Sequence, residues 1–280
     1  MRFTKMHGCG NDYVYINGFE EKIPADKKRD FVIHASDRHF GIGSDGVIFI
    51  NPSDMADFEM EMYNADGSRA EMCGNGIRCV AKYVFDKGMT DKTEITIESF
   101  QRIRPVTIIP KAGKAELIRV DMGVPELKPE NIPVKSRKDI VVNEAINVLG
   151  KEYRMTCVSM GNPHAVVFMD PKELEIEKIG PFFENHAIFP NRTNTEFVRV
   201  EDKNNVYMRV WERGTGETLA CGTGCCATAV ACVLNGKTDR RVTVHVLGGD
   251  IEVEWNEEDG HIYMTGPGTT VFEGEIDLYQ

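Results

Sequence analysis

The sequence lacks the patterns that mark several common classes of protein. No run of apolar residues is long enough to cross a membrane as a helix, and the first eight residues, MRFTKMHG, contain no apolar signal core. Basic residues are outnumbered, with 33 Lys and Arg against 44 Asp and Glu, and the formal net charge is −11. This charge argues against nucleic acid or an anionic membrane as a partner. A cytoplasmic protein that binds a small molecule is compatible with all three observations.

Eight cysteines are present, but they follow neither a disulfide nor a metal-binding pattern. Cys225 and Cys226 are adjacent, Cys232 lies in an apolar run, and no Cys-x-x-Cys pair occurs. We therefore expect reduced thiols and no zinc site. The glycine turn at 41–46 lacks the lysine of a phosphate-binding loop and precedes a strand pattern, so it predicts an ordinary turn.

The chain contains an internal repeat with a spacing of 148 residues. Residues 63–88 read YNADGSRAEMCGNGIRCVAKYVFDKG, and residues 211–236 read WERGTGETLACGTGCCATAVACVLNG. The two segments align without a gap, so that Cys73 corresponds to Cys221 and Gly88 to Gly236. Each cysteine is followed by an apolar pattern with helical spacing that ends at a glycine. Each half of the chain is therefore predicted to place a cysteine at the start of a helix.

The second of these helices, expected over residues 224–234, contains no charged residue and should be buried on all sides. Strand patterns precede and follow the helix in both halves, without the regular strand–helix alternation of a doubly wound sheet. The sequence therefore predicts an α+β fold with two pseudo-symmetric halves. In each half a curved, mostly antiparallel, barrel-like sheet should surround a central helix.

A thiol at a helix N-terminus lies beside backbone N–H groups and the positive end of the helix dipole, which favour the thiolate and lower its pKa. The flanking glycines let a ligand approach the backbone closely. Two such thiols suit the inversion of a carbon centre, in which a base removes a proton from one face and an acid returns one to the other. Backbone donors at the two helix starts can stabilise the carboxylate as the carbanion forms.

The whole chain resembles the diaminopimelate epimerase family. The segments that carry the resemblance are KMHGCGNDYV at 5–14, YNADGSRAEMCGNGIRC at 63–79, SMGNPH at 159–164, PNRTN at 190–194, WERGTGETLACGTG at 211–224 and YMTGPG at 263–268. The resemblance implies cofactor-independent conversion of LL-2,6-diaminopimelate to the meso form, for lysine and peptidoglycan biosynthesis. It also implies a homodimer and a last strand that returns to the first half. The expected domains are residues 1–120 with 268–280, and residues 121–267.

The resemblance implies a role for each of thirteen residues. The acid/base thiols would be Cys73 and Cys221. The carboxylate at the reacting carbon would be held by Gly74, Asn75, Gly222 and Thr223. The distal end of the substrate would be held by Asn11, Asn64, Asn162, Asn194 and Arg213. The thiols would be tuned by His164 and Glu212, and Glu212 would also bind substrate. No metal or cofactor is implied.

Two positions depart from the family's pattern: this chain has Gly46 where some members have glutamine, and Phe272 where some have tyrosine. Three other functions remain open at this stage. The chain could racemise another amino acid such as proline, hydroxyproline or histidine, act as a thiol–disulfide redox protein, or bind a ligand without catalysis. Arg213 and the four asparagines favour a substrate with a second polar end, because a monofunctional substrate would leave those groups unpaired.

Overall fold

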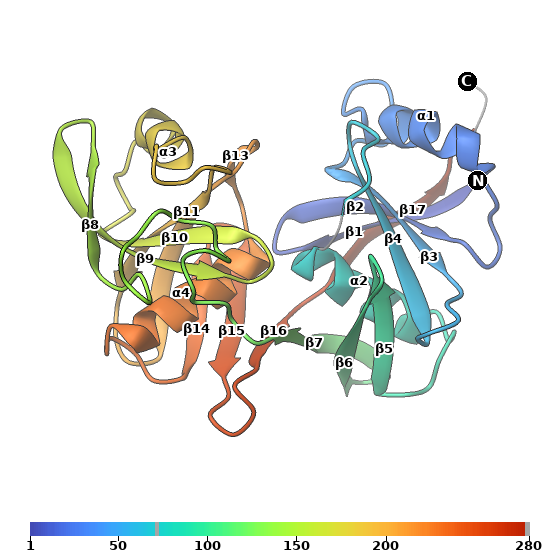
Figure 1. Ribbon diagram of the computed structural model, residues 1–280. Coiled ribbons are helices and arrows are strands. Elements are labelled where there is room, and N and C mark those ends of the chain that lie inside the picture. Colours follow the sequence, from blue (N-terminus) through green and yellow to red (C-terminus); the bar gives the residue numbers. More distant parts are fainter. Residues whose placement is uncertain (71–72, 278–280) are drawn as a thin grey trace. The chain divides into compact units, whose positions relative to one another are not determined.

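The structure is a computed structural model that describes residues 1–70 and 73–277 (Figure 1). Met72 of the first cysteine motif, and residues 278–280 of the expected first domain, lie outside the described residues. The chain divides into two compact units. The first unit contains Met1–Val120 and the segment that begins at Gly266, and the second contains Asp121–Thr265.

The first unit is a curved sheet with two helices. Its elements are β1 (Arg2–Gly8), β2 (Asn11–Asn17), α1 (Ala25–Ser36), β3 (Gly46–Asn51), β4 (Phe58–Asn64), α2 (Gly74–Asp86), β5 (Glu94–Ser99), β6 (Arg102–Lys111), β7 (Lys114–Gly123) and β17 (Thr269–Glu275). The pairs β2–β3 and β4–β5 are parallel. The pairs β1–β2, β3–β4, β5–β6, β6–β7 and β1–β17 are antiparallel.

The second unit repeats this arrangement. Its elements are β8 (Glu144–Val148), β9 (Lys151–Ser159), β10 (Pro163–Phe168), α3 (Ile176–Glu184), β11 (Asn194–Val200), β12 (Asn205–Glu212), β13 (Gly216–Thr218), α4 (Gly222–Leu234), β14 (Arg241–Val246), β15 (Gly249–Trp255) and β16 (Ile262–Gly266). The pairs β10–β11 and β12–β14 are parallel. The pairs β9–β10, β11–β12, β14–β15 and β15–β16 are antiparallel, as are β8–β9 and β12–β13.

Strand order and strand direction therefore agree between the units, and the bounds of α2 and α4 differ by the same 148 residues as the sequence repeat. The predicted fold class is confirmed: each unit is an α+β half built around a helix. The described strands form a mixed sheet rather than a closed barrel. Among the described residues, no helix is both long and apolar enough to cross a membrane.

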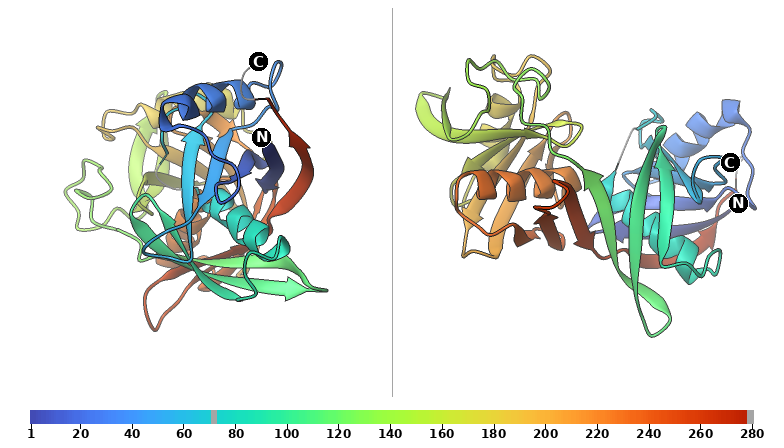
Figure 2. Two further views of the ribbon diagram at one scale, coloured as in Figure 1. Left: turned by 90° about the vertical axis from the view of Figure 1, so that its right-hand side faces the viewer. Right: turned by 60° about the horizontal axis from the view of Figure 1, so that its bottom comes forward.

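Each unit is built in layers around its central helix. Figure 2 shows α2 among the strands of the first unit, where it packs against β1, β2, β5 and β6. Side chains on successive residues of β3 point to opposite faces. Val47 and Phe49 pack with Phe31 of α1, and Ile48 lies against the start of α2. In the second unit Phe197 of β11 likewise packs with Phe183 of α3.

Several local expectations are sharpened by the structure. Strands β1 and β2 form a tight hairpin, because they are joined by Cys9 and Gly10 alone, both with positive φ. Gly88 and Gly236 have φ of +70° and +64° and directly follow the C-cap residues of α2 and α4, as predicted. The short strands β8 and β13 were not predicted from the sequence.

Candidate functional site

The first thiol lies at the start of α2. Cys73 is the N-cap residue, and its sulfur accepts a hydrogen bond from the backbone N–H of Gly76 at 3.2 Å. This is the bond that a serine or aspartate N-cap makes to the third helical residue. Cys73 is half-buried, in contrast to the other seven cysteines, which are buried. The predicted place of Cys73 at a helix N-terminus is confirmed.

Two predicted substrate-binding asparagines surround this sulfur. The Cys73 thiol donates to Oδ1 of Asn11 at 3.1 Å, and Nδ2 of Asn75 donates to the same oxygen at 3.4 Å. Asn11 begins β2, directly after the hairpin turn, while Asn75 is the second residue of α2. Residues 62 or more positions apart are thus brought together by the packing of α2 against the β1–β2 hairpin.

Asn64 lies at the end of β4, opposite Gly46 in the antiparallel ladder. It is exposed, and its side chain donates to Oγ of Ser68 at 3.0 Å. A Cβ atom on Gly46 would lie 2.0 Å from the carbonyl oxygen of Tyr63. The glutamine that some relatives carry at this position therefore cannot be accommodated without a shift of the β3–β4 backbone.

The second thiol lies at the start of α4, in a more enclosed setting. Cys221 is the N-cap residue and is only 5% exposed, and its sulfur lies 3.5 Å from Oγ1 of Thr223. Burial raises the pKa of Cys221 well above that of an ordinary thiol, and the carboxylates of Glu212 and Glu196 raise it further. The lowered pKa expected from the helix N-terminus is wrong for this cysteine, because burial and the two carboxylates outweigh the backbone donors.

Glu196 is a component of this site that sequence reasoning missed. It corresponds to Ile48 of the first unit in the 148-residue register, and it is fully buried on β11. A Cβ on Gly224 would lie 2.8 Å from its Oε1, just as a Cβ on Gly76 would lie 2.8 Å from Cδ1 of Ile48. A carboxylate thus stands where the first unit has a methyl group. The repeat register contains this signal, as an acidic residue at an inward strand position.

His164 and Asn162 belong to the same cluster. His164 is fully buried on β10, and its Nδ1 lies 2.6 Å from Oε1 of Glu196, while its Nε2 lies 3.0 Å from Oδ1 of Asn162. No hydrogen-bond partner of the other Glu196 oxygen, Oε2, is found among the described residues. Burial raises the pKa of Glu196, although the charge of His164 opposes the shift.

The remaining predicted residues of the second unit gather where β11 begins and β12 ends. Asn194 accepts from the backbone N–H of Arg213 at 2.8 Å and donates to the carbonyl of Pro163 at 2.9 Å. The exposed Arg213 guanidinium donates to the Asn191 carbonyl at 3.1 Å. Glu212 accepts from Oγ1 of Thr218 at 2.5 Å, and burial raises its pKa.

The predicted residues therefore form one cluster in each unit. The first unit gathers Asn11, Cys73, Gly74 and Asn75, with Asn64 at the end of the neighbouring strand pair. The second unit gathers Asn162, His164, Asn194, Glu212, Arg213, Cys221, Gly222 and Thr223. Each cluster combines a thiol, a helix N-terminus and amide groups, which are the components of acid/base chemistry at a carbon next to a carboxylate.

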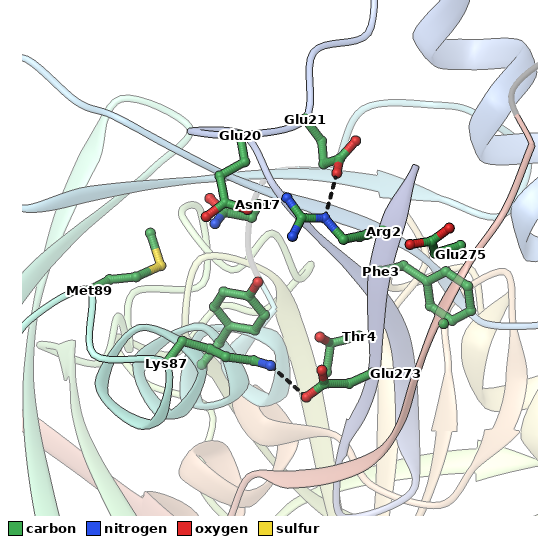
Figure 3. A pocket seen from close by; sticks show the side chains of 12 residues that line it. Arg2, Phe3, Thr4, Asn17, Glu20, Glu21, Lys87, Met89, Glu273 and Glu275 are labelled. Atoms are coloured by element: carbon green, nitrogen blue, oxygen red, sulfur yellow. Dashed lines mark hydrogen bonds and ion pairs between the residues drawn. The ribbon is translucent and has the colours of Figure 1, made fainter.

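A pocket of about 480 Å³ occurs elsewhere in the first unit (Figure 3). Its lining includes Arg2, which donates to Glu21, and Lys87, which donates to Glu273. Lys87 is the C-cap of α2, whereas Cys73 is its N-cap. At 1.5 Å per residue the two ends are about 20 Å apart. None of the predicted site residues lines this pocket, so it is separate from the thiol.

Comparison with known proteins decides the family. The sequence profile of the family described as diaminopimelate epimerase matches residues 3–128 and 156–271, which together include both cysteine motifs. The chain belongs to the diaminopimelate epimerase family. A diaminopimelate epimerase from Acetivibrio thermocellus is 58% identical over 279 residues, with 99% of each chain covered. One from Methanococcus maripaludis is also 58% identical, and covers 99% of this chain and 100% of its own.

Solved structures show that this family's fold is shared more widely. A phenazine biosynthesis protein of the PhzF family from Bacillus anthracis has a TM-score of 0.70 at 16% identity, with 99% of this chain and 98% of that chain covered. A hydroxyproline epimerase from Agrobacterium vitis has a TM-score of 0.70 at 15% identity, with coverage of 100% and 92%. At these identities the likeness concerns the fold alone.

Proposed function

We propose that this chain interconverts LL-2,6-diaminopimelate and its meso form without a cofactor, with Cys73 and Cys221 as the two acid/base groups. The observation that carries the proposal is the pair of N-cap cysteines, one in each unit, at equivalent positions of the 148-residue repeat. Identity of 58% to diaminopimelate epimerases over almost the whole chain supports the choice of substrate. In this proposal the two units are the two domains of the enzyme, and each supplies one thiol.

The proposed reaction moves one proton at each face of the carbon. The thiolate of one cysteine takes the α-proton and becomes a thiol, and the electron pair of the broken C–H bond passes into the carboxylate. The thiol of the other cysteine then gives its proton to the opposite face and becomes a thiolate. Backbone N–H groups of Gly74, Asn75, Gly222 and Thr223 would hold the carboxylate and stabilise its added charge.

The environments of the two thiols support a division of roles for conversion of the LL form. Cys221 is buried beside Glu196 and Glu212, and its raised pKa favours the thiol, which suits the acid. Cys73 is half-buried and then acts as the base. His164 and Glu212 tune the second thiol in this proposal, because Glu196 links His164 to the start of α4.

The distal end of the substrate needs polar partners. We assign this role to Asn11 and Asn64 in the first unit and to Asn162, Asn194 and Arg213 in the second, with Glu212 binding the reacting ammonium group. A zwitterionic amino-acid head requires both donors and acceptors, which amide side chains provide. The exposed guanidinium of Arg213 suits the distal carboxylate.

The test is incubation of the purified chain with LL-diaminopimelate in D₂O, without added cofactor and with a thiol reductant. We expect the meso form to appear with one deuterium at the inverted carbon, because the acid that returns the proton exchanges with solvent. Neither inversion nor deuterium uptake would contradict the proposed function. Parallel incubations with L-proline, trans-4-hydroxy-L-proline and L-histidine serve as controls, and inversion of one of these instead would support the racemase alternative.

None of the eight cysteines, all of which lie in the described part of the chain, forms a disulfide, which supports a reduced, cytoplasmic setting and a thiol chemistry that needs both sulfurs unoxidised. A thiol–disulfide redox role makes the opposite prediction about reductant, since its active form would cycle through a disulfide. Loss of inversion on addition of dithiothreitol would therefore contradict the epimerase.

We also propose that the chain forms a homodimer. Val271 and Phe272 on β17 are 55% and 47% exposed, and Phe272 packs edge-on against Phe3 of β1. Apolar side chains exposed on a strand at the margin of a sheet are typical of surfaces that are covered in an assembly. Light scattering of the purified chain gives its mass in solution, and the mass of a single chain at micromolar concentration would contradict a dimer.

A further inference from the structure

A chain of hydrogen bonds passes the first thiol and ends on a charged group at each side. Nη2 of Arg78 donates to Oδ1 of Asn75 at 2.9 Å. Nδ2 of Asn75 donates to Oδ1 of Asn11 at 3.4 Å, and Nδ2 of Asn11 donates to Oδ2 of Asp45 at 2.7 Å. The Cys73 sulfur lies 3.1 Å from the same Asn11 oxygen.

The two charged ends fix the direction of every hydrogen bond in this series. An asparagine amide can be turned end for end, and only its neighbours decide which end faces where. A guanidinium has donors only, so Asn75 must turn its oxygen toward Arg78 and its nitrogen toward Asn11. A carboxylate has acceptors only, so Asn11 must turn its nitrogen toward Asp45. Both ends therefore require the oxygen of Asn11 to face Cys73.

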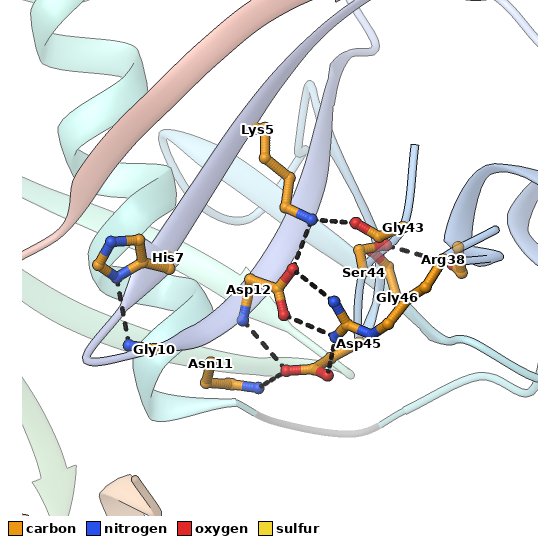
Figure 4. Close-up of polar contacts among 11 residues, drawn as sticks. Lys5, His7, Gly10, Asn11, Asp12, Arg38, Gly43, Ser44, Asp45 and Gly46 are labelled. Atoms are coloured by element: carbon orange, nitrogen blue, oxygen red, sulfur yellow. Dashed lines mark hydrogen bonds and ion pairs between the residues drawn. The ribbon is translucent and has the colours of Figure 1, made fainter. Parts of the chain in front are cut away.

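Both terminal groups are themselves held by other contacts. Arg78 is fully buried and donates to the carbonyls of Gly74 and Pro267, each at 3.1 Å. Figure 4 shows that Asp45 accepts from Nη2 of Arg38 at 2.9 Å and from the backbone N–H of Asp12 at 3.1 Å. Neither end can turn away without breaking these bonds.

The consequence for Cys73 follows from the atom that faces it. The backbone N–H of Gly76 supplies the sulfur with one donor, while Asn11 presents an acceptor. A thiol satisfies both, because it accepts from Gly76 and donates its own proton to Asn11. A thiolate would place its negative charge against the lone pairs of the Asn11 oxygen. The orientation of Asn11 therefore favours the protonated sulfur.

We propose that Asp45 and Arg78 are positioning residues that, through Asn11 and Asn75, keep Cys73 protonated until substrate binds. The inference rests on the proposed function, in which Cys73 is the base and must lose this proton before it can act. A substrate that engages Asn11 would remove the acceptor of the thiol proton, and the sulfur would then give this proton to solvent water and become the thiolate. This series of hydrogen bonds would thus couple substrate binding at Asn11 to ionisation of Cys73.

Other titratable groups lie on the elements that pack around the start of α2. Besides Arg78, those on the described elements include Lys5 and His7 on β1, Asp12, Tyr13 and Tyr15 on β2, and Cys79 on α2 itself, and Lys5 is paired with Asp12. The buried residues of β5 and β6 carry no titratable group: they are Ile95, Ile97, Ser99, Val106 and Ile108. Burial raises the pKa of both Tyr15 and Cys79, so neither carries charge near neutral pH. Asp12 is the remaining carboxylate on β2, and it serves as the control below.

The test is the pH dependence of alkylation of Cys73 by iodoacetamide, followed on the Cys73 peptide by mass spectrometry in a Cys221→Ser background. Only the thiolate reacts, so the midpoint reports its ionisation. Asp45→Asn offers both a donor and an acceptor, so it removes one of the two constraints on Asn11 and leaves only the long 3.4 Å bond from Asn75 to hold its orientation. We expect its midpoint to fall by about one pH unit more than that of the control, the size of one hydrogen bond.

Asp12→Asn is the matched control. It removes the same charge from a neighbouring carboxylate that also binds Arg38, and leaves the bond between Asn11 and Asp45 in place. Equal shifts in the two variants would show that charge alone acts, and would overturn the proposal, as would no shift with Asp45→Asn. Alkylation needs no substrate, so these outcomes are independent of whether the chain epimerises diaminopimelate.

A second measurement needs no variant and is unaffected if Asp45→Asn fails to fold. Neutron diffraction from deuterated crystals of the unsubstituted chain distinguishes the nitrogen of an asparagine amide from its oxygen. We expect the Asn11 nitrogen to face Asp45 and deuterium to lie on the Cys73 sulfur. An Asn11 nitrogen that faces the sulfur would overturn the proposal.

Discussion

At the scale of single residues, the differences between the two copies of the repeat are chemically more informative than the similarities. Ile48 and Glu196 occupy the same position relative to the central helix, yet one is a methyl-bearing core residue and the other a buried carboxylate. Arg78, a buried cation on α2, corresponds to Cys226 on α4. The first thiol therefore has a buried cation on its own helix, and the second has buried carboxylates beside it.

Glu196→Gln should lower the pKa of Cys221, because one of the two carboxylates that raise it is removed. If Cys221 is the acid, activity is lost as the pH rises through its pKa, so the alkaline limb of kcat/KM for LL-diaminopimelate should move to lower pH. The pH profile of kcat/KM measures this shift. Glu201→Gln is the control, since Glu201 is exposed and pairs with Arg199. An alkaline limb that stays in place would contradict the proposed influence of Glu196 on the thiol.

At the scale of elements, local sequence pattern determines the bounds of each central helix, and the surrounding strands determine its position in the fold. The C-cap glycines and the helical spacing of apolar residues set the bounds of α2 and α4. Strands β3 and β4 and the start of α2 pack closely because glycines occupy the positions where a side chain would not fit. Gly46 is the clearest of these, because a Cβ there would overlap the backbone of β4.

Gly46→Ala should destabilise the first unit by about 1–3 kcal/mol, the usual cost of forcing extra atoms into a packed core. A Cβ at this position would lie 2.0 Å from the Tyr63 carbonyl oxygen, so the β3–β4 ladder must shift. Urea denaturation measures the free energy of unfolding. Gly113→Ala is the control, because its Cβ would meet nothing within 4 Å and only its φ of +77° opposes the change. An equal loss in both variants would show that crowding at Gly46 is unimportant.

At the scale of the whole molecule, the repeat supplies one thiol from each unit, and the proposed inversion requires both. The chain also returns to its first unit at the end, where β17 pairs with β1 as the family resemblance implied. The chain therefore passes from the first unit into the second and returns, since the first unit contains both the beginning of the sequence and the segment that begins at Gly266.

Cys73→Ser and Cys221→Ser should each reduce inversion of LL-diaminopimelate by about 10²–10⁴-fold, the range attributed to a positioned acid or base. A serine hydroxyl is too weak an acid to replace the thiol, but its size preserves the helix cap. Circular dichroism and thermal melting establish that the fold is retained. Cys226→Ser, a change at another buried cysteine of α4, should keep most of the activity. Near-normal inversion by either N-cap variant would contradict a two-thiol mechanism.

The sequence by itself determined what depends on local pattern. The repeat, the two N-cap cysteines, the central helices and the α+β class all follow from spacing within short segments, because helical periodicity, caps and turns are set by neighbouring residues. Element ends are predicted less well: the helix expected over residues 224–234 begins at Gly222, because the cap geometry at Cys221 decides where it starts. The fold class follows from these patterns, whereas the diaminopimelate epimerase family is recognised by the resemblance of the cysteine motifs and the other quoted segments.

The tertiary structure alone decided the environment of each sulfur. In the sequence Glu196 looks like an ordinary strand residue, and only the packing of β11 against α4 places it beside the second thiol. Asp45 looks like a turn residue, and only the β1–β2 hairpin brings Asn11 to it. The pKa of a thiol depends on its burial and on charges within a few ångströms, and these are properties of segments that are far apart in the chain. The cysteines at the two helix starts are therefore visible in the sequence, whereas the raised pKa of Cys221 and the oxygen that faces Cys73 are visible only in the fold.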